Sequence, residues 1–231
     1  MKTFKALSLL LSYPSEELQQ AIPQIDALLH AEGLLGPKRM ETLAPLLRDL
    51  ARGDLYDLQE RYVLLFDRSR TLSLNLFEHI HGESRDRGGA MVDLLDMYRA
   101  GGFDLGGTEL PDHLPVLLEY LSTRPLAEAQ EVLQGAGHIL VALGERLVRR
   151  DAAYAAVLEA LVAIAEADPE TEEVQTLLAV KDDDPEDLAA LDAVWSEAQV
   201  TFGPDPNAGC RVSRDLLARM DPAAPAARAA S

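Results

Sequence analysis

Leucine and other apolar residues recur at every third or fourth position along most of the chain. This spacing places them on one face of an α-helix, so each stripe predicts a helix that buries one side. No segment keeps the alternation of apolar and polar residues that marks a strand, and no internal repeat is evident. The pattern therefore predicts an all-α protein, built as a single helical bundle domain. The stripes occupy residues 7–11, 18–29, 43–50, 55–66, 91–98, 114–121, 133–147 and 154–164.

Capping residues and helix breakers indicate where several of these helices begin and end. Ser15 precedes two glutamates and Asp54 precedes a new stripe, and both residue types accept hydrogen bonds from the free N–H groups of a helix start. Gly33 follows the last apolar position of its stripe, where glycine commonly ends a helix. Pro111 is expected in the first turn of the helix that buries 114–121, because the missing N–H of proline costs least there.

The chain changes character after the last long stripes, which predict helices over 125–149 and 152–167. Residues 68–75 are expected to be a polar connector between two stripes. From Asp168 onward acids dominate, and the end of the chain is rich in proline and alanine, which is typical of segments without a packed core. The predicted organisation is a helical bundle over 1–167, an acidic linker with a short helix over 168–202, and a disordered tail over 203–231.

Composition and charge narrow the function classes. Of the 231 residues, 48% are hydrophobic, which argues for a folded domain, while 21 basic and 39 acidic residues give a formal net charge of −18. Such a field repels phosphate backbones and attracts basic peptides, so nucleic acid is not expected as a partner. Cys210 is the single cysteine, which excludes an intrachain disulfide and cysteine-based zinc or iron–sulfur sites.

The N-terminal segment is expected to be a first amphipathic helix. Lys2 and Lys5 precede a short apolar run, but Tyr13-Pro14 follows it in place of the small residues of a signal-peptide cleavage site. No apolar stretch approaches the roughly 18 residues that a membrane-spanning helix needs. We therefore expect a cytoplasmic protein without stable membrane insertion.

Residues 77–88 concentrate histidines and charges between two helices. A third histidine follows in the segment Glu109-Leu110-Pro111-Asp112-His113. Loops that are rich in specific polar groups tend to carry binding or catalysis, so both segments are candidate functional regions. The polar and aromatic candidates in the first segment are Phe77, Glu78, His79, His81, Glu83, Arg85, Asp86 and Arg87.

The histidines and carboxylates match known metal-ligand spacings only in part. A di-iron bundle needs two Glu-x-x-His pairs, and Glu78 with His81 supplies one of them. Asp112-His113 reverses the His-Asp order of metal-dependent phosphohydrolases, and no zinc-protease, nucleophile-elbow, phosphate-loop or dinucleotide motif is present. A metal-dependent helical-bundle enzyme using Glu78, His81 and His113 is the alternative function, but the pattern favours a protein that is not an enzyme.

These residues also have structural interpretations. His79 and His81 can be helix-end residues bonded to nearby carboxylates, and Arg85 with Asp86 can form an exposed ion pair worth under about 1 kcal/mol. Asp112 and the residues beside it can be a helix cap and nothing more. Both interpretations stay open from the residues alone.

Four motifs resemble the respiratory nitrate reductase assembly chaperones, the delta-subunit or NarJ-type family of redox-enzyme maturation chaperones. The resemblance covers about residues 7–202, including the leucine-rich start up to Tyr13-Pro14 and the late segment 191–197. The motifs are Tyr62-x-x-x-Phe66-Asp67, the long string Leu76–Gly88, Met91-Val92-Asp93-Leu94, and Glu109-Leu110-Pro111-Asp112-His113-Leu114-Pro115.

The resemblance implies a cytoplasmic, all-helical chaperone for nitrate reductase assembly. Such a protein binds the basic N-terminal region of the apo catalytic (alpha) subunit and assists insertion of the molybdenum cofactor and an iron–sulfur cluster. It binds no cofactor permanently; transient contact with molybdenum–bis(guanine dinucleotide) and with cofactor-delivery proteins is implied. It is expected as a monomer or weak homodimer. A structural subunit of a larger complex is a further class that the residues leave open.

The same resemblance suggests roles for the partner-binding residues. Tyr62 and Phe66 line the peptide groove or belong to the core, and these alternatives stay open. Glu109, Asp112 and His113 are the best candidates for a rim that contacts the peptide. Arg85 and Arg87 are candidates for meeting an anionic phosphate of the cofactor, since arginine forks fit phosphate oxygens.

Overall fold

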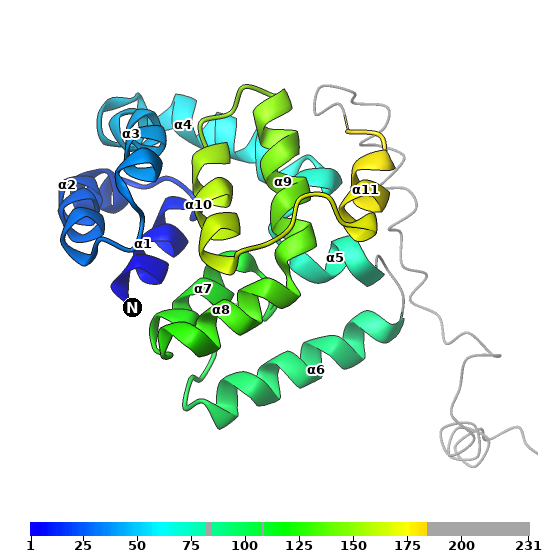
Figure 1. The fold of residues 1–231 in the computed structure, drawn as a ribbon. Helices are drawn as coiled ribbons and strands as arrows, with labels where there is room; N and C mark the ends of the chain where they lie inside the picture. Colours follow the sequence, from blue (N-terminus) through cyan, green and yellow to red (C-terminus); the bar gives the residue numbers. More distant parts are fainter. Residues whose placement is uncertain (82–84, 108, 184–231) are drawn as a thin grey trace, which may run out of the picture. The chain divides into compact units, whose positions relative to one another are not determined.

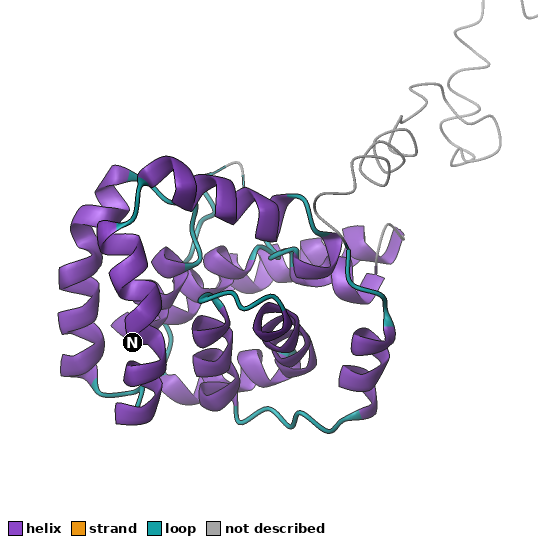
Figure 2. Cartoon of the chain, turned by 90° about the horizontal axis from the view of Figure 1, so that it is seen from above, coloured by secondary structure: helices purple, strands orange, loops and turns teal. Residues whose placement is uncertain are grey.

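The protein is an all-α domain, as the spacing of apolar residues predicted (Figure 1). The computed structural model describes residues 1–81, 85–107 and 109–183. Within these residues the chain forms helices joined by loops, without a strand (Figure 2). The helices are α1 (Lys2–Leu10), α2 (Glu16–Glu32), α3 (Pro37–Arg52), α4 (Leu55–Tyr62), a π-helix η1 (Val63–Asp67), a 3₁₀ turn η2 (Arg70–Leu72), α5 (Leu76–His81), α6 (Arg85–Ala100), α7 (Leu114–Ser122), α8 (Leu126–Gly135), α9 (Gly137–Arg149), α10 (Ala155–Ala165) and α11 (Glu172–Ala179).

The predicted caps mark the helix ends. The Ser15 side chain accepts a hydrogen bond of 3.2 Å from the Leu18 N–H at the start of α2. Asp54 does the same for α4, accepting from the Tyr56 N–H at 2.9 Å. Gly33 ends α2 with a φ of 66°, a left-handed conformation that glycine adopts without steric cost. The structure therefore confirms the three helix ends that these residues predicted.

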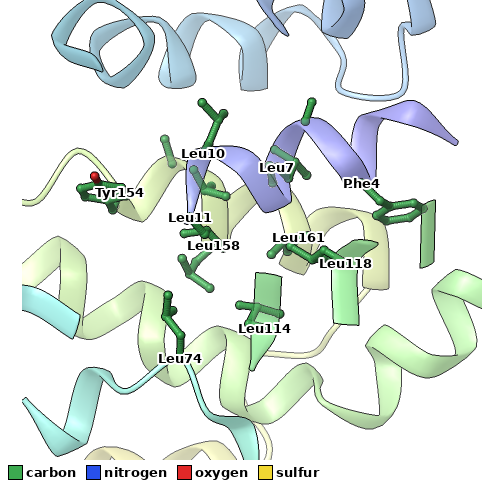
Figure 3. Packing of buried hydrophobic residues seen from close by; sticks show 14 of the residues in the cluster. Phe4, Leu7, Leu10, Leu11, Leu74, Leu114, Leu118, Tyr154, Leu158 and Leu161 are labelled. Carbon is green, nitrogen blue, oxygen red and sulfur yellow. The ribbon is translucent and has the colours of Figure 1, made fainter. Parts of the chain in front are cut away.

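Helix α1 lies at the centre of the core (Figure 3). Phe4, Leu7, Leu10 and Leu11 have no exposed surface. They pack between α2 on one side and α7 and α10 on the other, against side chains that include Leu118. Each fully buried leucine contributes about 1.5–3 kcal/mol through the removal of apolar surface from water. The N-terminal segment is therefore a structural helix, as the sequence predicted.

Two helix boundaries differ from the prediction. The helix expected over 125–149 is broken at Ala136, between α8 and α9. A Cβ atom on Gly137 would lie 2.8 Å from the Ala167 Cβ, so the glycine admits a close approach of these two segments. The helix expected to contain Pro111 begins instead at Leu114, and Pro115 takes the first-turn position.

The segment 68–75 is more buried than a polar connector would be. Its hydroxyl and backbone groups find partners on α9 and on the residues after α11, which removes the cost of burying them. The buried residues of this segment are Ser69, Thr71, Leu72, Ser73 and Leu74.

The C-terminal part of the described chain begins with α11, which packs against α9. Val174 of α11 has no exposed surface. The short helix predicted near 186–197, the tail from 203, and Cys210 lie outside the described residues, and the domain boundaries stay predictions. In the part of the chain that the structure describes, no helix is long and apolar enough to cross a membrane.

Candidate functional site

A groove of about 350 Å³ lies where α1, η1 and the start of α7 meet. Three of the predicted site residues, Tyr62, Glu109 and His113, line this groove although they are far apart in the sequence. Its walls combine apolar side chains, hydroxyl groups and carboxylates. The lining residues are Lys5, Ser8, Leu9, Ser12, Tyr13, Tyr62, Asp67, Glu109, His113, Pro115, Val116 and Glu119.

Tyr62 lines the groove and belongs to the core at the same time. Its side chain is 5% exposed, and its hydroxyl donates a hydrogen bond of 2.9 Å to the Leu11 carbonyl oxygen of the α1 end. The Tyr13 ring, which is half exposed, meets the Tyr62 ring edge-on at 5.5 Å. Phe66 lies behind, with its ring centroid 4.9 Å from that of Tyr62, and packs on Tyr154. Phe66 is therefore a core residue that supports the groove.

The π-helix η1 continues α4 with a wider turn that contains an additional residue. Such turns within helices often occur at functional sites, because they redirect the side chains that follow. Here the wide turn ends at Asp67, whose exposed carboxylate lines the groove. The pKa of Asp67 is raised above its usual value. Partial burial of the carboxyl group is the main cause; the nearby His113 lowers the pKa in part, and the Glu109 carboxylate raises it.

The groove has an acidic end and a mixed end. At the acidic end, the His113 Nδ1 lies 3.5 Å from a Glu109 carboxylate oxygen. Burial lowers the pKa of His113, which favours its neutral form, so Asp67 and Glu109 give this end negative charge. At the other end, Lys5 and Glu119 form an ion pair at 2.6 Å. The groove as a whole therefore suits an amphipathic ligand that carries positive charge.

The turn before α7 owes its position to Asp112. The Asp112 side chain is fully buried, and one of its oxygens accepts a hydrogen bond of 3.0 Å from the Phe77 N–H. Its backbone oxygen accepts from the Leu76 N–H at 3.0 Å, and the Leu114 N–H donates to the Leu74 oxygen at 2.8 Å. A bridge between Asn75 and His113 lies between these bonds. Asp112 thus joins the start of α5 to the groove wall, and a direct contact with a partner stays a prediction.

Arg87 is already engaged by carboxylates. Its Nη2 lies 3.2 Å from a Glu78 oxygen and 3.6 Å from the buried Asp112 oxygen. Burial raises the pKa of Asp112, the hydrogen bond from Phe77 lowers it, and the Arg87 charge lowers it further. The guanidinium therefore ties α6 to α5 and to the turn before α7. We do not assign Arg87 to a cofactor phosphate.

The histidines of α5 have partners within the fold. The His79 Nε2 lies 2.8 Å from the Ser73 carbonyl oxygen, and burial lowers the pKa of this histidine. A neutral ring with its proton on Nε2 satisfies that carbonyl. The His81 ring meets the Phe77 ring edge-on with centroids 5.8 Å apart. Both histidines thus have partners within the fold, although these are a backbone carbonyl and an aromatic ring and not the carboxylates that the structural interpretation expected.

The remaining candidates are dispersed. Asp86 is exposed in the first turn of α6, Arg85 is the first residue of that helix, and Glu83 lies outside the described residues. Among the described residues, no group of three or more His, Cys, Asp or Glu side chains could hold a metal ion. The set Glu78, His81 and His113 that the metal-dependent alternative requires is therefore not assembled.

A larger hollow of about 520 Å³ lies between α2 and α3. Its lining includes Leu29, Met40, Asp26 and Glu41, and none of the predicted site residues. We place the candidate site in the smaller groove because residues of two motifs far apart in the sequence, around Tyr62 and around His113, converge there.

The sequence did not indicate several residues of the groove. Asp67 directly follows Phe66 in the first motif, so its position beside a candidate residue was an available signal. Tyr13 ends the leucine-rich start that the family resemblance includes. Lys5 and Glu119 gave no such signal, because their meeting depends on the packing of α1 against α7.

Comparisons with known proteins identify the family of this chain. The family model for the nitrate reductase delta subunit matches residues 14–160. Over 205 residues the chain is 43% identical to the nitrate reductase molybdenum cofactor assembly chaperone NarJ of Escherichia coli K12, covering 88% of this chain and 86% of that protein. NarW, a second assembly chaperone of this type in the same strain, is 40% identical over 214 residues, covering 91% and 87%.

A solved structure has the same fold. A protein described as a redox enzyme maturation protein of Archaeoglobus fulgidus superposes with a TM-score of 0.53 at 23% identity, covering 72% of this chain and 94% of that one. This likeness concerns the fold alone. The two Escherichia coli relatives are named as assembly chaperones and not as enzymes. From the family match and these identities together, the chain belongs to the nitrate reductase delta subunit family.

Proposed function

We propose that this protein is a cytoplasmic assembly chaperone for a respiratory nitrate reductase. In this proposal it binds the N-terminal region of the apo catalytic subunit and keeps that subunit competent for insertion of the molybdenum cofactor and an iron–sulfur cluster. The family and the two named relatives support the coarse role. The groove supports the finer one, because it brings Tyr62, Glu109 and His113 together on one surface.

The groove suits a helical peptide with one apolar face. Leu9, Tyr13 and Val116 offer apolar contacts, and Asp67 and Glu109 offer negative charge beside them. In helix-in-groove recognition the apolar contacts supply affinity, while charges at the edge fix the orientation of the helix. The net charge of −18 adds a long-range attraction for a basic segment.

The cofactor enters this proposal as cargo that the client receives. The proposal includes transient contact with molybdenum–bis(guanine dinucleotide) and with cofactor-delivery proteins. Arg87 faces two carboxylates, so a phosphate there would have to displace Glu78 or compete with the buried Asp112.

Calorimetry with a synthetic peptide tests the proposal. The peptide should carry the N-terminal residues of the cognate catalytic subunit, with a scrambled peptide of equal charge as control. We expect a Kd of about 1 μM or tighter for the true sequence, which corresponds to about −8 kcal/mol. The scrambled peptide should bind weakly, because charge alone does not fill the apolar groove. Failure of the protein to bind either the peptide or the apo subunit would falsify the proposal.

A pull-down separates a chaperone from a structural subunit of the enzyme. In cells that cannot make molybdenum cofactor, the tagged protein should capture the apo catalytic subunit. In cells with cofactor, the mature enzyme should be free of it. Co-purification with the mature, cofactor-loaded enzyme would assign the protein to the complex itself.

A further inference from the structure

Arg146 is a buried cation on α9 that joins three separate segments. Its side chain is 2% exposed. Its guanidinium donates to the backbone carbonyl oxygen of Thr71 at 2.9 Å and to that of Leu177 at 2.6 Å. Leu177 lies in the last turn of α11. Its Nε also lies 3.0 Å from an Asp182 oxygen, an ion pair without hydrogen-bond geometry. A buried arginine is costly to desolvate, so these partners must compensate for it.

Asp183 and Arg150 extend this network to the turn η2. One Asp183 carboxylate oxygen accepts from the Thr71 N–H at 2.8 Å and from the Ser69 hydroxyl at 3.3 Å. Arg150 donates to the Asp183 backbone oxygen at 2.7 Å and to the Ser69 hydroxyl at 3.2 Å. Residues 180–183, which we call the strap, are thus fastened to α9 and to the segment 69–71.

The segment that the strap holds leads directly to the groove. Ser73 follows η2, and its carbonyl oxygen pairs with the His79 ring of α5. The next residues, 74–76, are hydrogen-bonded to Asp112 and Leu114. Between these two bonds lies His113, which lines the groove. A continuous series of contacts therefore runs from the strap through 69–76 to one wall of the groove.

We propose that Asp183 and Arg146 are positioning residues for the partner-binding groove, acting through the segment 69–76. This inference rests on the proposed function for its consequence, which is client affinity. The segment 69–76 has little regular structure of its own, since η2 is the only helical turn in it before α5 begins at Leu76. Hydrogen bonds to the strap and to α9 fix the course of the backbone in this segment. The course of that backbone in turn fixes where the turn 112–114, with His113, lies. Asp182 and Asp183 of the acidic linker are thereby linked to the site.

Three variants test this series of contacts. Asp183→Ala removes the acceptor for Thr71 and Ser69, whereas Asp183→Asn removes the charge but keeps an oxygen that can accept the same bonds. Asp57→Ala makes the same charge change at an exposed position of α4 and serves as the matched control. For each protein, the histidine ring signals by NMR, the peptide Kd and the free energy of unfolding in urea are measured.

For Asp183→Ala we expect the His79 and His113 signals to move while that of exposed His30 stays in place. The peptide Kd should rise about five- to tenfold, within the range of couplings measured between linked sites. For Asp183→Asn, the His113 signal and the peptide Kd should stay close to those of the unchanged protein. Asp57→Ala should change neither quantity. A loss of unfolding free energy with unmoved His113 signals and unchanged Kd would make the strap a structural brace only and overturn the inference.

Arg150→Gln provides a second test of the strap. If Asp183→Ala does not fold, Arg150→Gln removes the donors to Ser69 and to the strap and leaves Arg146 in place, with the same expected shifts. If the unchanged protein binds no peptide, the proposed function fails, but the His113 signal still decides whether the strap positions the groove wall. An unmoved signal in both variants contradicts the inference in either case.

Discussion

The Asp112 carboxylate accepts a hydrogen bond of 3.0 Å from the Phe77 N–H, 35 positions earlier in the chain. The bond connects the second and fourth motifs of the family resemblance inside the protein. Asp112 has no exposed surface, so its charge acts between the two motifs. A residue that the sequence suggested as a contact for the client is in this structure a support for the groove wall.

Replacement of Asp112 tests this support. Asp112→Ala should lower the free energy of unfolding by about 3 kcal/mol, because the Phe77 N–H and the Arg87 charge lose their buried partner. Asp112→Asn keeps one acceptor and should cost less. Urea denaturation measures both losses. Unchanged stability together with lost client affinity would instead show that Asp112 contacts the client directly.

The partly buried His79 should make the free energy of unfolding depend on pH. Burial lowers its pKa, so the folded protein prefers the neutral ring, while the unfolded chain takes up a proton near the usual pKa of about 6.5. The stabilisation from the neutral ring is thus complete above that pH and is lost as the pH falls below it. His79→Gln removes this titration, and we expect a smaller fall in unfolding free energy between about pH 7.5 and pH 5.5.

The exposed His30 provides the control for that measurement. His30→Gln makes the same substitution at an exposed position, where we expect the unfolding free energy to change little. An identical profile for His79→Gln and the parent protein would show that His79 does not contribute to the acid sensitivity.

Tyr62 has separable roles in the core and in the groove. Tyr62→Phe removes the hydroxyl that bonds to the Leu11 oxygen and should lower the unfolding free energy by about 1 kcal/mol. The ring stays in place, so the peptide Kd should change less than twofold, on the order of the smallest side-chain effects. Thermal denaturation and calorimetry measure the two quantities. A large rise in Kd for Tyr62→Phe would mean that the hydroxyl itself contacts the client.

The acids of the groove should set the salt dependence of client binding. The double variant Asp67→Asn and Glu109→Gln removes both carboxylates at the acidic end while it retains their size. We expect weaker binding at low salt and a smaller loss of affinity as salt rises, because the screened charge term is reduced. The unfolding free energy should change by less than about 1 kcal/mol, since both residues are exposed.

The larger hollow supplies a matched control for these acids. Asp26→Asn with Glu41→Gln makes the same change in net charge between α2 and α3. This pair should leave the peptide Kd nearly unchanged at every salt concentration. An equal effect of both pairs would show that net charge, and not the groove, governs the affinity.

The sequence predicted the class of the fold and many of its local features. The spacing of leucines gave the helices, and Ser15 and Asp54 begin α2 and α4 as predicted. The family resemblance, drawn from the motifs around Tyr62 and Asp112, is confirmed by the family match. These features depend on neighbours within a few positions, which is why they can be read from a single sequence.

The groove depends on contacts between distant positions, and these could not be predicted. Lys5, Tyr62 and Glu109 meet only because α1 packs between other helices. The burial of Asp112 and Arg146 runs against the general exposure of charged residues, so residue type alone does not indicate it. The segment 68–75 was expected to be a polar connector for the same reason, since the partners that satisfy its polar groups lie more than 70 positions away.

The number of residues in the wide turn Val63–Asp67 determines whether Asp67 reaches the acidic end of the groove. It does so as much as the identity of the side chain at that position. Deleting one residue there would let α4 continue as an ordinary helix and rotate every later side chain by about 100° about its axis. Asp67 would then leave the groove although the aspartate itself is retained. When related sequences are aligned to this one, a single-residue gap between Tyr62 and Arg68 therefore marks a change in the binding surface, even where the motif letters still match.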